Sequence, residues 1–375
     1  MDARPTACIR RSLFATLLAL AFVTIVVSAR AQQESTGGNA ATSPASSLPA
    51  WAFPIPPGRA GGPATPARAG GAAAGGPATP TRAGGAPGGA GARGRGAQDQ
   101  TLLSVPGGTR QYTAAQTRDN FNIADWHPDE HAPMPEVVSH GRRPDVRACG
   151  FCHLANGFGK PENAALAAQP ADYIVQQMHD YRDGRRTGSE PRIVGPSLMI
   201  AIAKAATEEE IRAAAEYFAS VGRKPWIRVI EADMVPVTRN GGVMYVVVDG
   251  GGTEPVGNRI VEVAENYQAT QLRDGGSGFI AYVPVGSVKR GEALVTTGGN
   301  GKTVACGICH GPDMRGLGVV PSIAGRSPSY MARQLYDFKS GSRNGPSAPL
   351  MKGVVAQLTD TDIVEMLAYL STLKP

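Results

Sequence analysis

The stretch "KTVACGICHGPDMRGLG", Lys302–Gly318, places two cysteines three positions apart and a histidine directly after the second cysteine. The same arrangement occurs in "RACGFCHLANGFG", Arg147–Gly159, with every cysteine and histidine 157 residues earlier. A pattern that recurs at a fixed offset indicates a duplicated unit. The two groups therefore decide how the rest of the chain is divided.

The duplication extends well beyond these two groups. The first cysteine of each group is followed 24 residues later by a tyrosine, Tyr173 or Tyr330. After the tyrosines, "YIVQQMHDYRDGRRTG" aligns without a gap to "YMARQLYDFKSGSRNG". Near the end of each unit, "MIAIAKAATEEEIRAAAEYFASV" corresponds to "MKGVVAQLTDTDIVEMLAYLSTL", so Met199 aligns with Met351. We therefore expect a unit of roughly 70–80 residues to occur twice.

The two units are predicted to be mainly helical, with a different structure between them. Thr207 with Glu210, and Thr359 with Asp362, form the pattern in which a threonine caps the first turn of a helix. Apolar residues follow both pairs at helical spacing, which gives each last helix one buried face. Between the units, from residue 226 to about residue 285, β-branched and aromatic runs are bounded by glycines. This composition predicts a small antiparallel β insert.

The N-terminal region reads as an export signal followed by a low-complexity segment. Two arginines precede an uncharged apolar run, Leu13–Val27, and the small-residue pattern Ala29–Ala31 follows it. Residues 1–31 are therefore predicted to be a cleaved secretory signal peptide; an uncleaved membrane anchor is the alternative. Residues 32–110 are rich in Gly, Ala and Pro and are predicted to be a disordered, flexible segment. Within it, the apolar "LPAWAFPIPP" from Leu48 is expected to lie as a strap against the folded part.

The folded part is predicted to divide into a first helical domain at residues 111–224, the β insert at 225–288 and a second helical domain at 289–375. The net charge of +6 is modest for a chain of this length. Nothing in its distribution indicates a nucleic-acid partner.

Cysteine usage narrows the chemistry of the two groups. Cleavage after Ala31 would remove Cys8 and leave four cysteines, all in the repeated groups. In an oxidising compartment such pairs close as disulfides, bind metal or are used in covalent attachment. A zinc site would need the two groups to converge and would leave both histidines idle. A redox dithiol would need a βαβ surrounding that short helical units do not provide.

Covalent haem attachment uses every residue of the groups. Two thiols on one helical turn reach the vinyl groups of a haem, and the adjoining histidine is directed at the iron. The sequence thus predicts two covalently bound haem c groups. They would be attached through Cys149 and Cys152 and through Cys306 and Cys309. His153 and His310 would each ligate one iron.

These motifs resemble those of the class I c-type cytochromes, specifically the tandem two-haem cytochromes of the periplasm. The resemblance rests on CGFCH, CGICH, the "Y…Q…G.R" helix and the methionine before a final helix. It covers about Cys149–Val221, the first copy, and Gly291–Leu373, the second copy. It implies a mainly α fold with two class I cytochrome c units, and a methionine sulfur from a loop as the sixth iron ligand.

The repeat indicates which methionines these are. Met199 and Met351 are the only methionines that align with each other in the two copies. Met178 aligns with a leucine and is expected to fill the core. His179 would give a two-histidine iron, but its partner position in the second copy is a tyrosine. Met199 and Met351 are therefore the predicted ligands, with His179 as the alternative at the first iron.

The resemblance carries two further expectations. The aligned Arg186 and Arg343 would bind haem propionates; solvated arginines at a helix end are the alternative. A carbonyl near a proline after the motif orients the ligand histidine in this family, and Pro321 fits that place. The first copy departs from the pattern, with Ala164 at the proline position and Ala168 where the second copy has glycine. The geometry of that loop is therefore in doubt, although a carbonyl needs no particular side chain.

The predicted function is that of an electron carrier and not of an enzyme. The protein would pass single electrons between periplasmic or membrane redox proteins, and an uncleaved signal would tether it to the membrane. One alternative is a two-haem peroxidase, which needs an open iron and neighbouring acid and base groups. The other is an electron-transfer subunit of a dehydrogenase complex, with the β insert as its docking surface.

Overall fold

The computed structural model describes residues 48–55 and 100–375, which belong to one unit, Ser46–Pro375. The predicted signal peptide and most of the low-complexity segment lie outside the described residues. No helix in the described part of the chain has the length and apolar character needed to cross a membrane.

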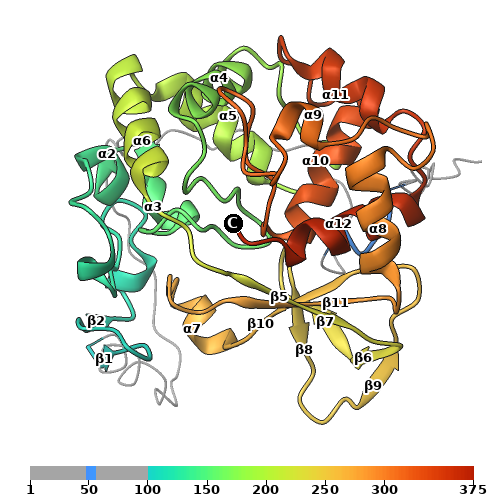
Figure 1. Cartoon of the computed structure of the whole chain (residues 1–375). Coiled ribbons are helices and arrows are strands. Elements are labelled where there is room, and N and C mark those ends of the chain that lie inside the picture. The colour runs from blue at the N-terminus through green and yellow to red at the C-terminus, as the bar shows by residue number, and fades with distance from the viewer. Residues whose placement is uncertain (1–47, 56–99) are drawn as a thin grey trace, which may run out of the picture. The chain divides into compact units, whose positions relative to one another are not determined.

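The first copy consists of helices that begin with the CGFCH motif (Figure 1). Its helices are α3 (Cys149–His153), α4 (Ala171–Arg182), α5 (Gly195–Ala205) and α6 (Glu208–Ser220). The predicted capping box is present at the start of α6, where Thr207 and Glu210 bond to each other's backbone N–H. The apolar face of α6, Ile211 to Phe218, is buried in the core of this copy, as its spacing predicted.

The second copy repeats these elements and adds a longer first helix. Its helices are α8 (Ser287–Thr297), α9 (Gly307–His310), α10 (Pro328–Ser340), α11 (Ala348–Val355) and α12 (Asp360–Thr372). Helix α8 packs closely on α12 because Gly291 lies at their crossing. A Cβ atom at Gly291 would come within 1.8 Å of the carbonyl oxygen of Glu365. At the corresponding place the first copy has only the one-turn α2 (Glu136–Ser139).

The backbone after the two motifs follows the same course in both copies. Leu154 and Gly311, which align, are both left-handed, with φ of 67° and 80°. The next such pair, Gly157 and Met314, has φ of 67° and 61°. Left-handed backbone is unfavourable for leucine and methionine, so their presence there shows that the turn itself is required. The duplication therefore holds for the backbone where the side chains differ.

The insert forms a five-stranded sheet, but the sheet is mixed and not antiparallel as predicted. Its order is β5–β11–β10–β8–β7, with β5 parallel to β11 and β8 parallel to β10. Parallel neighbours need long connections. Here β5 and β11 are joined through the whole insert, including a separate β6–β9 pair and the helix α7 (Tyr267–Gln271). Strand bounds are β5 Ile227–Glu231, β6 Met234–Pro236, β7 Thr238–Asn240, β8 Tyr245–Val247, β9 Thr253–Pro255, β10 Val261–Ala264 and β11 Phe279–Val283.

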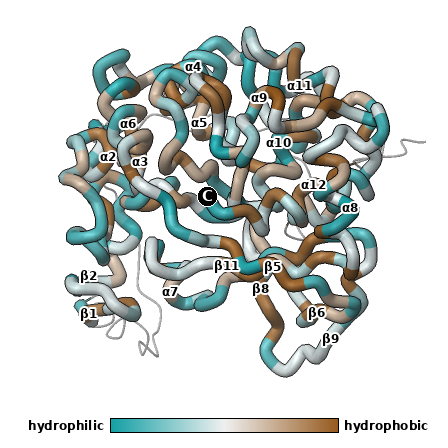
Figure 2. Tube along the Cα trace, viewed as in Figure 1, coloured by the Kyte–Doolittle hydropathy of each residue, from teal (hydrophilic) through white to brown (hydrophobic). Residues whose placement is uncertain are grey.

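Both faces of this sheet are packed, and its strands are largely hydrophobic in Figure 2. Along β11 the buried positions alternate, as expected of a strand with two unlike faces. Ala281 and Val283 belong to the core of the second copy, and Phe279 belongs to the core of the first. The insert is therefore part of both helical cores.

The apolar island at residues 48–55 lies as a strap against the folded part, as predicted. Trp51, Ala52 and Phe53 are buried in the core of the second copy. The ring of Phe53 meets the ring of Tyr336 edge to face, with centroids 5.8 Å apart. The carbonyl of Ala52 accepts a hydrogen bond from the buried guanidinium of Arg333.

Regular structure also begins earlier than Gln111, where the first domain was predicted to start. Strand β1 (Leu102–Leu103) pairs with β2 (Tyr112–Thr113), and two-residue strands leave no periodic pattern to detect. Further short elements lie before the first copy. They are the 3₁₀ turns Gln116–Arg118 and Pro128–Glu130 and the hairpin of β3 (Gly141–Arg142) with β4 (Val146–Arg147).

Candidate functional site

Both motif histidines are held by one ring nitrogen. The Nδ1 atom of His153 lies 2.8 Å from the carbonyl oxygen of Ala164, and that of His310 lies 2.7 Å from that of Pro321. Each Nδ1 therefore carries the proton, and each Nε2 is left unprotonated and available to bind a metal. Burial lowers the pKa of both imidazoles, which favours the neutral form that binds metal. The carbonyl of Ala164 thus makes the contact with the motif histidine that was expected at the proline position.

The doubtful loop of the first copy has the same backbone as its counterpart. Ala168 adopts φ of 54°, close to the 61° of Gly325. The N–H of Ala168 donates to the carbonyl of Phe218, as that of Gly325 does to Leu370 in the last helix of its own copy. The first copy therefore keeps the turn at the expense of a strained alanine.

The four motif thiols form no disulfide; Cys149, Cys152 and Cys306 are half-buried, and Cys309 is exposed. Burial raises the pKa of Cys149 to about 12 and that of Cys306 to about 11. Redox dithiols work with a lowered thiol pKa, so these values disfavour that alternative. Cys149 packs against the core of the first copy and Cys306 against the core of the second. The two motifs thus occupy separate surroundings, whereas a shared zinc site would need them together.

The aligned methionines lie in helices and not in loops, contrary to what the resemblance implied. Met199 is on α5 and Met351 is on α11, and both side chains are half-buried. Met351 packs against the core of the second copy. Met178 packs against the core of the first copy, as expected of a core filler.

These donors fit a covalently attached haem in each copy. Each copy offers two free thiols, one neutral imidazole with a free Nε2 atom, and one thioether on the short helix that precedes the last helix. Thioether and imidazole are the axial pair found in cytochromes c.

The arginines of the repeated helix end are buried at the contact between the copies. Arg186 is 5% exposed and Arg343 is 8% exposed, so the alternative of solvated arginines is wrong. Each guanidinium donates to a tyrosine hydroxyl and to a glutamine side-chain oxygen of the other copy. The partners of Arg186 are Tyr330 Oη at 2.9 Å and Gln334 Oε1 at 2.8 Å; those of Arg343 are Tyr173 Oη at 2.8 Å and Gln177 Oε1 at 2.9 Å.

This crossing is symmetric because all six residues occupy aligned positions. Residues 186 and 343 also pair through their backbones as an antiparallel bridge. Neutral tyrosine and glutamine oxygens thus accept hydrogen bonds from both guanidiniums, while the buried carboxylate of Asp337 interacts with Arg186 electrostatically.

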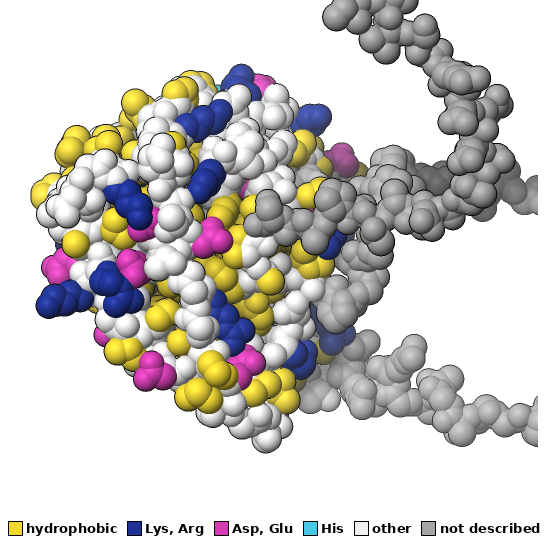
Figure 3. All heavy atoms as spheres, turned by 90° about the vertical axis from the view of Figure 1, so that its right-hand side faces the viewer, with side chains coloured by type: hydrophobic (Ala, Val, Ile, Leu, Met, Phe, Trp, Pro, Cys, Tyr) yellow, Lys and Arg dark blue, Asp and Glu magenta, His cyan; other side chains and the backbone are white. Residues whose placement is uncertain are grey.

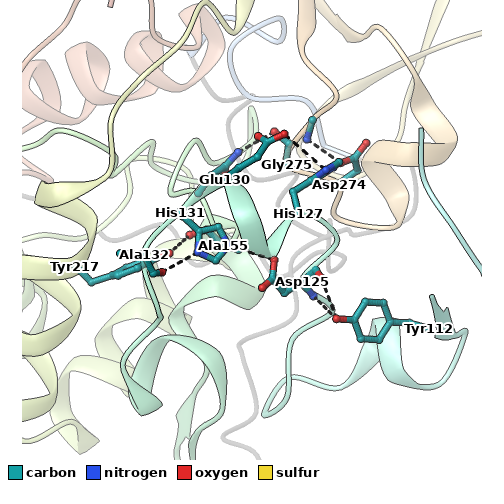
Figure 4. Close-up of polar contacts among 12 residues, drawn as sticks. Tyr112, Asp125, His127, Glu130, His131, Ala132, Ala155, Tyr217, Asp274 and Gly275 are labelled. Carbon is teal, nitrogen blue, oxygen red and sulfur yellow. Dashed lines mark hydrogen bonds and ion pairs between the residues drawn. The ribbon is translucent and has the colours of Figure 1, made fainter. Parts of the chain in front are cut away.

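A second polar cluster, which sequence reasoning missed, joins the segment before the first copy to the insert (Figure 4). His127 Nε2 lies 2.7 Å from a carboxylate oxygen of Asp274, and His131 Nε2 lies 3.2 Å from one of Asp125. The side chain of His131 is only 4% exposed. The partners His127 and Asp274 are 147 residues apart, so no spacing in the sequence could reveal them.

The insert also touches the first motif directly. The Nε atom of Arg273 donates to the carbonyl of Phe151, inside CGFCH, at 3.0 Å. Its guanidinium carbon lies 3.8 Å from the centre of the Phe151 ring. The carbonyl of Ala155, just after the motif, accepts from Tyr217 Oη at 2.7 Å (Figure 4). The insert and the last helix thus brace the two sides of the first motif.

Comparison with known proteins places the chain in a family. The model of the cytochrome c family matches residues 288–374. Cytochrome c4 of Stutzerimonas stutzeri is 30% identical over 148 residues, which cover 38% of this chain and 68% of that protein. The chain is a class I c-type cytochrome. It belongs to the two-haem group that includes the cytochromes c4, so haem c bound covalently through CxxCH is a property of its family.

Two other relatives cover more of this two-haem cytochrome. Cytochrome c4 of Pseudomonas aeruginosa is 25% identical over 230 residues, 60% of this chain and 83% of that protein. A thiosulfate dehydrogenase electron acceptor of Thiomonas intermedia is 25% identical over 233 residues, 61% of this chain and 79% of that protein. These relatives place the cytochrome among electron-transfer proteins.

Proposed function

We propose that the protein is a periplasmic dihaem cytochrome that passes one electron at a time between redox partners. The observation that supports this most is the pair of aligned histidines, each fixed through Nδ1 and free at Nε2. Each haem c, when bound, supplies a one-electron couple between ferric and ferrous iron. His153 and His310 would each bind one iron through Nε2, and the motif cysteines would hold the haem covalently.

Met199 and Met351 are proposed to fill the sixth positions. A histidine and methionine pair raises the reduction potential relative to two harder ligands. A thioether in the sixth position also leaves no vacancy for dioxygen or peroxide. The chain's own residues thus favour outer-sphere electron transfer over chemistry on a substrate.

The buried arginines are proposed to neutralise haem propionates at the contact between the copies. A planar guanidinium suits a carboxylate, and the side chains that accept hydrogen bonds from Arg186 and Arg343 across the contact are neutral. Because each arginine also bonds the opposite copy, the two haem sites would share one rigid interface.

The partners are proposed to be periplasmic or membrane redox proteins, such as a dehydrogenase that donates electrons. One relative is named as an electron acceptor of thiosulfate dehydrogenase, which supports this class of donor. On the face shown in Figure 3, basic and acidic side chains are interspersed with hydrophobic ones. Such a mixed surface is better suited to a transient protein partner than to a strongly charged ligand.

The axial methionines provide the test. A thioether bound to ferric haem gives a weak far-red charge-transfer band, so Met199→Ala and Met351→Ala should each remove about half of it and the double variant all of it. Met178→Leu is the matched control and should leave the band intact, because leucine already stands at the aligned position.

Haem content and ligand binding complete this experiment. The mass of the mature chain should include two haems. Wild-type protein should not bind carbon monoxide, whereas both methionine variants should. A single haem, or stoichiometric carbon monoxide binding at one wild-type haem, would replace the carrier by a haem enzyme.

A further inference from the structure

The loops that orient the two ligand histidines are bonded to the opposite copy. In the second copy, Ser322 directly follows Pro321, whose carbonyl accepts from His310. The backbone N–H of Ser322 donates to Oε1 of Gln169, in the first copy, at 2.9 Å. The amide Nε2 of Gln169 donates back to the carbonyl of Ser322 at 3.1 Å. The side chain of Gln169 thus bonds both the N–H and the carbonyl of Ser322, the residue after the one whose carbonyl accepts from His310.

The reverse contact is made by an arginine. Arg326, in the second copy, donates through Nη1 to the carbonyl of Ala165 at 2.7 Å and through Nη2 to that of Ala167 at 3.2 Å. Ala165 directly follows Ala164, whose carbonyl accepts from His153. The histidine loop of the first copy is therefore held from the second.

These contacts are equivalent under the duplication. Gln169 and Arg326 both stand four residues before the aligned tyrosine of their copy, and Ala165 aligns with Ser322. Gln169 is 6% exposed and Arg326 is 5% exposed, so water does not compete for these bonds. From this repeat position both copies contact the histidine loop of the other copy, one through glutamine and the other through arginine. Retention of the contact with two different side chains indicates a functional role for the position.

We propose that Gln169 and Arg326 are positioning residues, each of which sets the histidine–carbonyl hydrogen bond of the opposite copy and thereby the potential of the opposite haem. The inference rests on the proposed function, because it needs a haem on each histidine. It attributes coupling between the two haems to the loops whose carbonyls accept from His153 and His310. This coupling is separate from the role proposed for Arg186 and Arg343.

The physical reason lies in one peptide group. The carbonyl of Pro321 and the N–H of Ser322 belong to the same peptide unit, so a bond from Ser322 N–H to Gln169 polarises the carbonyl that accepts from His310. A stronger acceptor raises the basicity of the metal-bound imidazole and fixes its ring. A more basic imidazole stabilises ferric iron, so Gln169 lowers the potential of the second haem. Arg326 acts one peptide unit further away, and its effect on the first haem is smaller.

The test compares uncharged variants of similar size. Gln169→Met keeps the length of the side chain and removes its amide. At position 326, Arg326→Gln and Arg326→Met have the same charge, so their difference isolates hydrogen bonding from the loss of a positive charge. Thr187→Val is the control, because Thr187 also bonds across the interface, to the carbonyl of Ser342 at 3.0 Å, but away from both histidine loops.

Potentiometric titration should resolve two one-electron steps in the wild type. In Gln169→Met we expect the step of the second haem to rise, with at least a threefold change in its ferric to ferrous ratio at fixed potential, where tenfold is about 59 mV. The step that moves should be the one that also moves in Met351→Ala. Arg326→Met should move the other step relative to Arg326→Gln, by less than Gln169→Met moves its own, and Thr187→Val should move neither.

Nuclear magnetic resonance of the ferrous protein gives an independent readout. The Nδ1 proton of His310 should shift upfield and exchange faster in Gln169→Met, while that of His153 stays unchanged. Two wild-type steps that do not move in Gln169→Met would overturn this inference and leave the proposed function intact. A shift of the first haem instead would show that Gln169 acts within its own copy, and would also overturn it. Absence of two steps in the wild type would overturn the proposed function itself.

Discussion

The same substitution, glycine to alanine, is expected to destabilise the protein at the crossing of α8 and α12 and to stabilise it slightly at an open position on α11. Gly291 lies on α8 with its Cα against α12, and an added Cβ would stand 1.8 Å from the carbonyl oxygen of Glu365. Real Cβ atoms do not approach such atoms closer than 3.0 Å, so Gly291→Ala must separate the helices by about 1.2 Å. Gly353, on α11, has no atom within 4 Å of its added Cβ.

The expected magnitudes follow from these distances. A radial gap of 0.5–1 Å forfeits roughly a quarter to a half of each van der Waals contact, and overpacking costs about 1–3 kcal/mol. Because the displacement exceeds 1 Å and Leu294 and Val295 are buried on the same helix, we take the upper end, about 3 kcal/mol. Alanine regains about 1 kcal/mol of helix propensity over glycine. Gly291→Ala should thus destabilise by about 2 kcal/mol, and Gly353→Ala should stabilise by up to about 1 kcal/mol.

Guanidinium unfolding of the haem-loaded protein, followed by far-ultraviolet circular dichroism, measures both variants. The midpoint should fall for Gly291→Ala and rise slightly for Gly353→Ala. If Gly291→Ala were as stable as the wild type, the close crossing of α8 and α12 would be wrong. A fall of equal size for Gly353→Ala would show that glycine matters for some reason other than packing.

Two further predictions concern a strained turn and a buried ion pair. Ala168→Gly should stabilise by about 1 kcal/mol because left-handed backbone is costly for alanine. In contrast, Gly325→Ala should destabilise by at least about 2 kcal/mol, since it adds that strain and a contact of 2.6 Å with a carbonyl oxygen; equal unfolding midpoints for the two variants would contradict this. The hydrogen bond to Asp125 raises the pKa of His131 above its ordinary value of 6.5. The pair therefore stabilises fully below pH 6.5 and loses this stabilisation as pH rises through the folded pKa, so His131→Gln should lower the melting temperature more at pH 6 than at pH 8.5. An equal loss at both values would show that the pair is not charged in the folded protein.

Much of the candidate site was visible in the sequence because its parts are close together in the chain. The cysteines and histidine of each motif lie on one helical turn, and counting back from the aligned last helices paired Met199 with Met351, although the first copy has five extra residues before that point. The capping boxes at Thr207 and Thr359 were predictable for the same reason, since three residues fix their geometry. The loop of the first copy kept its carbonyl contact without a proline because any residue supplies a carbonyl.

Other features depended on how the units dock. The insert was recognised by composition, but the direction of its strands was not, because pairing depends on connections through space and not on the strands' own residues. Arg186 and Arg343 were aligned from the sequence, yet their burial was decided by the opposite copy.

The sequence by itself determined the chemistry of each half: a duplicated helical unit, two thiols and a histidine per unit, and a methionine in the same place in both. Local spacing within each unit and the alignment of the two units carry that information. The tertiary structure decided what connects the halves: Gln169 on the backbone of Ser322, Arg326 on that of Ala165, and an insert that enters both cores. The Gln169 and Arg326 contacts join residues more than 150 positions apart, so they exist only once two folded surfaces meet, and no periodicity along the chain encodes them.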